Sequence, residues 1–126
     1  MLPLLIFAGA GLGGVLRFYV GGWIQSSAGA AFPWGTLAVN ISGSALLAFA
    51  LPFLQQYLPA AEWRAFIAVG LFGGYTTFST FSYESISLVQ EGAWLRAATY
   101  VLASVVPCLL GAVLGLRAAG FVLPRS

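Results

Sequence analysis

The residues most able to do chemistry are concentrated in one stretch, GGYTTFSTFS, at positions 73–82. Two adjacent glycines are followed there by hydroxyl side chains at five of the seven positions 76–82. Glycine destabilises a helix interior by about 1 kcal/mol relative to alanine, and Ser and Thr compete for backbone hydrogen bonds. The stretch lies inside an apolar segment long enough to cross a bilayer. It therefore predicts a broken membrane-spanning helix, and such breaks commonly surround ion sites.

Three groups of polar or aromatic residues recur at helical spacing and could share one path with this break. They are Thr36 and Asn40 on one apolar segment, Phe78 and Phe81 on the next, and Tyr100, Ser104 and Cys108 on the last. Ser79, Thr80 and Ser82 are interleaved with the two phenylalanines, and Glu84 follows one turn further on. A single Ser or Thr in a membrane helix often bonds to its own backbone, and a Phe pair often serves packing. The coincidence of all three groups with a helix break favours a polar path.

This path offers more hydrogen-bond donors than charges. Amides, hydroxyls and the positive edges of aromatic rings attract an anion without a cation in the path. The N-terminus of a helix that restarts after the break adds a positive dipole end. Carbonyl groups released at the break suit a hard cation such as Na⁺ instead. An anion path beside a structural Na⁺ is the interpretation that uses all these groups.

The composition is typical of a membrane protein. Of the 126 residues, 60% are hydrophobic and 6% are charged, with a mean hydropathy of +0.96. Soluble domains carry about 25% charged residues. The net charge of +2 comes from five Arg and three Glu and forms no basic stripe for nucleic acid. Without His, and with three Glu, the chain has little material for catalysis, so we expect no enzyme.

The elements that must position these residues are four apolar segments, at about 2–24, 33–57, 63–89 and 93–116. Each is near or above the ~20 residues that a spanning helix needs. We therefore expect an all-α membrane protein with one domain, 1–126, and four transmembrane helices, the third of them broken. Small residues four apart, such as Gly70 and Gly74, predict close packing between the helices.

Charge gives this arrangement only a weak orientation. With four spans, Arg64, Arg117 and Arg125 fall on one side of the membrane and Arg96 on the other, while Arg17 lies inside the first span. Loops rich in Lys and Arg normally stay in the cytoplasm. So small a bias fits either a weak preference for termini inside or insertion in both orientations.

Three motifs resemble those of the Fluc/CrcB family of small bacterial fluoride channels. Residues 73–84, GGYTTFSTFSYE, are similar to the family's third-helix signature, and residues 33–43, PWGTLAVNISG, to its second-helix motif. Residues 9–19, which end in Arg17-Phe18-Tyr19, resemble its first helix. The resemblance covers all four segments in order. It implies a passive, fluoride-selective channel that exports toxic fluoride across the bacterial inner membrane, as an antiparallel, dual-topology homodimer with two pores.

The resemblance also implies roles for individual residues. Phe78 and Phe81 correspond to ring-edge fluoride ligands, and Asn40 to a pore amide near them. The polar lining comprises Ser79, Thr80, Thr36, Tyr100 and Ser104, with Glu84 beside it. The backbone carbonyls of Gly73 and Thr76, from both subunits, would hold one central Na⁺. Arg17 matches a family arginine of open role, Gly74 belongs to the signature, and Cys108 stands where a hydroxyl would extend the last polar row.

Two other classes remain open on the residues alone. A small proton-coupled exporter of guanidinium or other cations would need a membrane-embedded carboxylate, for which Glu84 is the candidate. A non-transporting membrane assembly subunit would explain the glycine faces but leaves the polar run at 76–82 without a purpose.

Overall fold

The computed structural model describes residues 1–124, which form helices and connecting turns with no β-strand in that range. Arg125, counted above in the charge comparison, lies outside the described residues. The helices are α1 (Leu2–Ala28), α2 (Trp34–Tyr57), α3 (Ala61–Trp63), the π-helix η1 (Arg64–Phe72), α4 (Gly73–Tyr75), α5 (Phe78–Gln90) and α6 (Trp94–Val122). Because α3, η1 and α4 follow one another without a gap, they make one helical run from Ala61 to Tyr75.

Three of these helices, α1, α2 and α6, are long and apolar enough to cross a membrane. Two continue beyond the predicted ends: α1 passes residue 24 and ends at Ala28, and α6 passes residue 116 and ends at Val122. The added turn of α1 is polar and still helical, and within it the hydroxyls of Ser26 and Ser27 donate back to the Trp23 carbonyl. The predicted segment 63–89 is divided between the run from Ala61 and α5.

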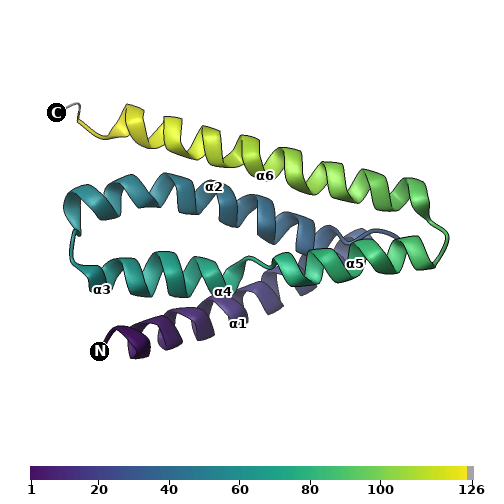
Figure 1. The fold of residues 1–126 in the computed structure, drawn as a ribbon, viewed down its shortest axis with the longest axis horizontal. Helices are drawn as coiled ribbons and strands as arrows, with labels where there is room; N and C mark the ends of the chain where they lie inside the picture. Colours follow the sequence, from purple (N-terminus) through teal and green to yellow (C-terminus); the bar gives the residue numbers. More distant parts are fainter. Residues whose placement is uncertain (125–126) are drawn as a thin grey trace.

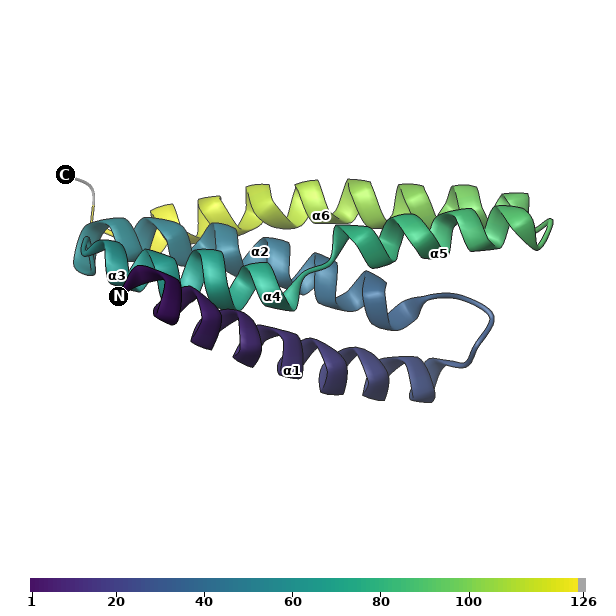
Figure 2. The ribbon, with the colours of Figure 1, turned by 60° about the horizontal axis from the view of Figure 1, so that its bottom comes forward.

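The long helices lie roughly alongside one another, as Figure 1 shows. α2 packs mainly against α6, and α1 packs mainly against η1. Figure 2 shows α1 diverging from the other helices toward its C-terminal end, whereas α5 stays against α6. The N-terminus, the turn between α2 and α3, and the end of α6 lie at one end of the molecule (Figure 1). The other two connections lie at the opposite end, so the helix break falls between the two ends.

Glycines let the helices of the bundle approach very closely. A Cβ atom added to Gly9 would overlap the carbonyl oxygen of Phe66, and one added to Gly74 would overlap that of Ala10. Both contacts join α1 to the helical run that precedes the break. Between apolar helices in lipid, close backbone contact of this kind supplies the association that the hydrophobic effect supplies in water.

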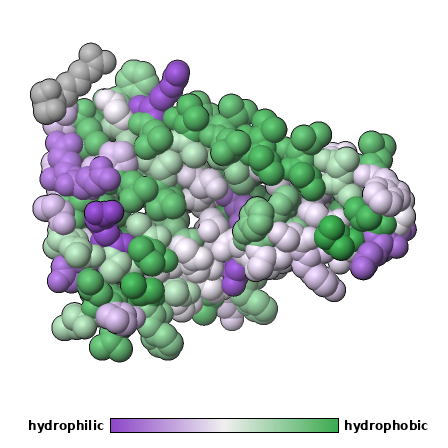
Figure 3. Space-filling model, viewed as in Figure 1, coloured by the Kyte–Doolittle hydropathy of each residue, from purple (hydrophilic) through white to green (hydrophobic). Residues whose placement is uncertain are grey.

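The interior of the chain is small, and its surface is largely apolar. One buried cluster joins α2, α5 and α6 through Leu37, Phe81, Leu88, Ala97 and Tyr100. Many other large apolar side chains are exposed along the helices. In Figure 3 hydrophobic residues cover the flank along α6, and hydrophilic residues gather toward the ends of the molecule. A surface of this kind is suited to hydrocarbon or to another helix.

Candidate functional site

The chain leaves the helical conformation at Thr76 and Thr77, between α4 and α5. Both residues have extended backbone, with φ −84° and ψ 157° at Thr76 and φ −150° and ψ 108° at Thr77. The Thr76 N–H makes the last helical bond of the first helix, to the Phe72 carbonyl at 3.0 Å, and the Thr76 hydroxyl donates to the same carbonyl at 2.9 Å. The Thr77 hydroxyl accepts the Thr80 N–H at 3.2 Å and caps α5. One helix therefore ends and the next begins within two positions, and Thr77 provides the cap of the second.

Asn40 of α2 holds the break in place from the side. Its amide Nδ2 donates to the Thr77 carbonyl at 3.0 Å, and its Oδ1 accepts the Thr77 N–H at 2.7 Å. The side chain thus satisfies both backbone groups of a residue that is buried and has left the helix. An amide nitrogen carries two protons, so one N–H of Asn40 is left for another acceptor. Sequence reasoning assigned Asn40 to a pore amide and missed this bridge.

The break leaves the backbone carbonyls of Gly73 and Thr76 without their helical hydrogen bonds. These are the two carbonyls that the family resemblance implied as Na⁺ ligands. In a continuous helix the Thr77 N–H would bond to the Gly73 carbonyl, but it bonds to Asn40 instead. The Thr80 N–H would likewise bond to the Thr76 carbonyl, but it bonds to the Thr77 hydroxyl. Both oxygens therefore lack their helical partners. Carbonyl oxygens are ligands that suit a hard cation, and two from one chain leave most of its coordination shell to other oxygens.

A carboxylate joins the polar residues of three helices. The Thr36 hydroxyl on α2 donates to Glu84 Oε1 at 2.9 Å, and the Tyr100 hydroxyl on α6 donates to Glu84 Oε2 at 2.6 Å. Tyr100 is fully buried, and its ring also meets Phe32 edge-on, with centroids 5.4 Å apart and planes at 89°. The hydroxyls of Thr36 and Tyr100, expected to line an anion path, thus already donate to an anionic side chain.

The two phenylalanines of α5 lie together but in different environments. Their ring centroids are 5.5 Å apart and the planes are tilted by 48°. Phe81 is 8% exposed and contacts the Tyr100 ring at 5.3 Å, whereas Phe78 is 77% exposed. The structure therefore brings one ring into the core and leaves the other on the surface of the single chain.

A hollow of about 300 Å³ lies beside the phenylalanine pair. Its lining comes from α2, the break, α5 and α6, and includes Asn40, Thr77, Phe78, Phe81, Ser104 and Cys108. Ser104 is 4% exposed, and its hydroxyl oxygen has no hydrogen-bond partner within residues 1–124. The predicted row on α6 is therefore split, because Tyr100 is bonded to Glu84 while Ser104 and Cys108 line this hollow.

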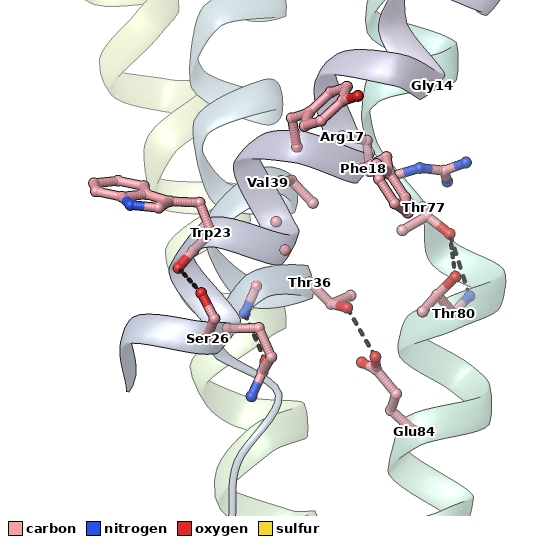
Figure 4. Close-up of a pocket in the computed structure, with 15 residues that line it drawn as sticks. Gly14, Arg17, Phe18, Trp23, Ser26, Thr36, Val39, Thr77, Thr80 and Glu84 are labelled. Carbon is pink, nitrogen blue, oxygen red and sulfur yellow. Dashed lines mark hydrogen bonds between the residues drawn. The ribbon is translucent and has the colours of Figure 1, made fainter. Parts of the chain in front are cut away.

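A second and larger hollow, of about 760 Å³, opens between α1, α2 and α5 (Figure 4). Arg17 lines it together with Thr36, Thr77, Thr80 and Glu84. In Figure 4 Thr36 on α2 points across the hollow to Glu84, and Thr77 points to Thr80. Two hollows therefore meet at the helix break, one with a guanidinium in its wall and one with the aromatic pair.

Several hydroxyls of the polar run have ordinary structural partners. The Ser82 and Ser85 hydroxyls donate to carbonyls of their own helix, as membrane hydroxyls often do. Ser79 lies 3.5 Å from the Thr77 hydroxyl, at the limit of a hydrogen bond. Thr80 accepts the Thr77 hydroxyl at 2.9 Å, so its own proton stays free for another acceptor. Among the residues described, no group of three or more His, Cys, Asp or Glu could hold a metal ion.

The chain is a multi-pass membrane protein. It has three apolar helices long enough to cross a membrane, and they surround a capped helix break with polar groups in the interior. The chain belongs to the CrcB family, since the family description "CrcB-like protein, Camphor Resistance (CrcB)" matches residues 4–116.

Similar proteins carry a more specific description. The chain is 48% identical over 119 residues to a protein of Rhodospirillum rubrum, a match that covers 91% of this chain and 92% of that one. It is 46% identical over 114 residues to a protein of Rhizobium meliloti, covering 90% and 91%. It is 44% identical over 117 residues to a protein of Thermus thermophilus, covering 93% and 92%. Each of these relatives is named fluoride-specific ion channel FluC.

Proposed function

We propose that this chain is a passive, fluoride-selective channel that exports toxic fluoride across the bacterial inner membrane. The observation that carries the proposal is its identity of 44–48%, over about nine-tenths of the chain, to relatives named fluoride-specific ion channels. The capped helix break, with donors on two sides, supports an ion path through the protein. Flow is downhill in this proposal, because the sequence contains no ATP-binding motif that could drive transport.

Four spans follow if the divided third segment also crosses the membrane. The helical run from Ala61 and α5 together extend from residue 61 to residue 90. At about 1.5 Å per residue a helical segment of this length is sufficient to span the hydrocarbon core. Non-helical backbone at Thr76 and Thr77 is then tolerable at membrane depth because Asn40 satisfies Thr77.

We infer that the active form is an antiparallel, dual-topology homodimer with two pores. The weak bias of the arginines supports insertion in both orientations. The large exposure of Phe78 supports a second copy against this face, because a proposed ligand of the ion needs to be shielded from lipid. Two released carbonyls per chain also become four when the breaks of two chains meet at the dimer axis.

Those four carbonyls, from Gly73 and Thr76 of each subunit, would hold the proposed structural Na⁺. The ion supplies positive charge that neutralises the dipoles of facing carbonyl groups at the centre of the dimer. The residues of this chain fit that role because both carbonyls have lost their helical hydrogen bonds. The carboxylates of this chain are not needed for such a site.

Fluoride is small and strongly hydrated, so a selective path has to replace its water with several donors at once. In the proposed path these donors are the ring edges of Phe78 and Phe81, the free N–H of Asn40, and the hydroxyls of Ser104, Ser79 and Thr80. Thr36 and Tyr100 can donate to fluoride only by releasing Glu84, because their hydroxyl protons are engaged there. A narrow path of this kind admits chloride less readily, since the larger ion cannot approach all donors together.

The decisive experiment is ion efflux from liposomes that contain the purified protein. Vesicles loaded with fluoride or with chloride are diluted into ion-free buffer and read with ion-selective electrodes. Rapid loss of fluoride with retention of chloride supports the proposal. Retention of fluoride by a well-folded protein, under conditions in which a relative named FluC conducts, overturns it.

A proton-coupled exporter of guanidinium or another small cation is the second candidate. The observation in its favour is Glu84, a carboxylate inside the helical bundle that is bonded from two other helices. Uptake of labelled guanidinium driven by a proton gradient, and its loss in Glu84→Gln, would distinguish this candidate from the channel.

A further inference from the structure

The hollow beside the phenylalanine pair contains the only thiol of the chain. Cys108 lies one turn beyond Ser104 on α6 and is half-buried in the wall of the hollow. The remaining lining residues are four polar ones, Asn40, Ser44, Thr76 and Thr77, and four apolar ones, Phe78, Phe81, Val105 and Leu109. Because the chain has one cysteine, no intrachain disulfide can consume this thiol.

Ser104 gives a second and independent indication that the hollow takes an occupant. Its hydroxyl oxygen is buried, lines the same hollow and has no hydrogen-bond partner among the described residues. Buried polar groups in folded proteins nearly always have a partner, either in the protein or in a bound molecule. The hollow therefore combines an unsatisfied hydroxyl, a thiol and room of about 300 Å³.

The chemistry of the wall selects a soft occupant. No carboxylate or imidazole lines this hollow, so it offers no ligand set for a hard divalent cation. A thiol prefers soft, polarisable partners, and a half-buried thiol is reached more readily by a small neutral molecule than by a charged, hydrated one. We propose that Cys108 is a modification site for small, neutral organomercury electrophiles, and that the adduct obstructs the ion path.

The reaction of Cys108 with methylmercury chloride balances without an oxidant or reductant. The S–H bond breaks and an S–Hg bond forms, the Hg–Cl bond breaks, and the proton and chloride pass to water. The methylmercury group is then attached beside Ser104, in a hollow that Asn40 and Phe81 also line. Obstruction rests on the proposed function, because it requires fluoride to pass these residues, whereas adduct formation does not.

The test combines fluoride efflux with intact-protein mass spectrometry on the same liposomes. We expect methylmercury chloride to add one group per chain to the native protein and to lower fluoride efflux by about tenfold or more. An excess of dithiothreitol should remove the group and restore efflux. Cys108→Ser should gain no mass, and its own efflux rate should be the same with and without the reagent.

A displaced thiol provides the matched control. Ser27 is exposed at the end of α1, and its hydroxyl bonds to Trp23 of the same helix. The double variant Cys108→Ser, Ser27→Cys should be labelled fully and keep its efflux. This result separates obstruction at Cys108 from a general effect of mercury on the protein or the bilayer.

Two results overturn the proposal: labelling of Cys108 only after denaturation, or full labelling in the native state with unchanged efflux. Absence of fluoride efflux before any treatment is a different failure, because it sinks the proposed function. In that case mass spectrometry alone decides the modification site, with native labelling in its favour and its absence against it.

Discussion

Replacing Asn40 with leucine removes the bridge between α2 and the helix break and keeps a side chain of similar length. Both hydrogen bonds to Thr77 are lost, one of 3.0 Å to its carbonyl and one of 2.7 Å from its N–H. Thr77 is only 7% exposed, so water cannot readily replace either bond. We therefore expect a clear loss of stability in addition to any effect on conduction.

The magnitude follows from the number of groups left without a partner. A buried donor or acceptor that loses its partner costs about 1–3 kcal/mol, so two such groups give about 2–6 kcal/mol. Interhelical side-chain hydrogen bonds measured in a membrane protein average only about 0.6 kcal/mol, which gives a lower bound near 1 kcal/mol for two. The backbone of the break has no alternative partner in the described structure, so we expect about 3 kcal/mol.

The free energy of unfolding can be measured by titrating SDS into dodecyl maltoside micelles and following the loss of helical circular dichroism. Ser82→Ala is the matched control, because that hydroxyl is exposed and bonds to the carbonyl of Phe78 in its own helix. The control should change the free energy by less than about 0.5 kcal/mol. A change equally small in Asn40→Leu would refute the structural bridge and leave Asn40 only a direct contact with the ion.

Three further predictions concern packing, the aromatic pair and the cation. Gly74→Ala should destabilise the protein by about 1–3 kcal/mol, because the new Cβ overlaps the Ala10 carbonyl, whereas Gly14→Ala, with open space at its Cβ, should not. Phe81→Ile should lower both fluoride efflux and the SDS midpoint, while Phe78→Ile, whose ring is 77% exposed, should lower efflux and leave the stability of a single chain within about 0.5 kcal/mol. Dialysis against a large organic cation in place of Na⁺ should lower the thermal midpoint, and Na⁺ at 100 times its dissociation constant should restore about 2.7 kcal/mol of stability.

Each of these has an outcome that contradicts it. Equal stability of Gly74→Ala and Gly14→Ala would contradict the close approach of α1 to α4. Normal fluoride efflux in both phenylalanine variants would remove the rings from the ion path. A thermal midpoint independent of Na⁺ would argue against a cation held by the Gly73 and Thr76 carbonyls.

The sequence was sufficient to predict a helical protein with apolar helices long enough to cross a membrane, three of which the structure contains. The apolar runs predicted α1, α2 and α6, because period and hydropathy are local properties of the chain. The glycine pair and hydroxyl run at 73–82 predicted a broken membrane-spanning helix; the structure has extended backbone at Thr76 and Thr77, and that this segment crosses the membrane stays a prediction. The helix ends were less accurate, because hydropathy does not indicate that the polar turn at 25–28 continues α1.

The sequence also identified polar residues on three segments as candidates for an ion path, but it could not show which of them form hydrogen bonds with one another. Thr36, Glu84 and Tyr100 were expected as parts of a common lining, and the structure joins them instead in one hydrogen-bonded group. The phenylalanine pair was expected on one helical face, and its two rings differ greatly in exposure. Pairing and exposure depend on how α2, α5 and α6 are rotated relative to one another.

What the sequence by itself determined is therefore local: which segments are apolar helices, and which side chains can donate hydrogen bonds. Only the tertiary structure decided that Asn40 forms hydrogen bonds with the backbone N–H and carbonyl of Thr77. It also decided that the Gly73 and Thr76 carbonyls lose their helical hydrogen-bond partners. The physical reason is that a residue at position 40 meets one at position 77 only after two helices have packed. Intrinsic preference stops the helix at the threonines, and tertiary contact determines which of the released groups are satisfied.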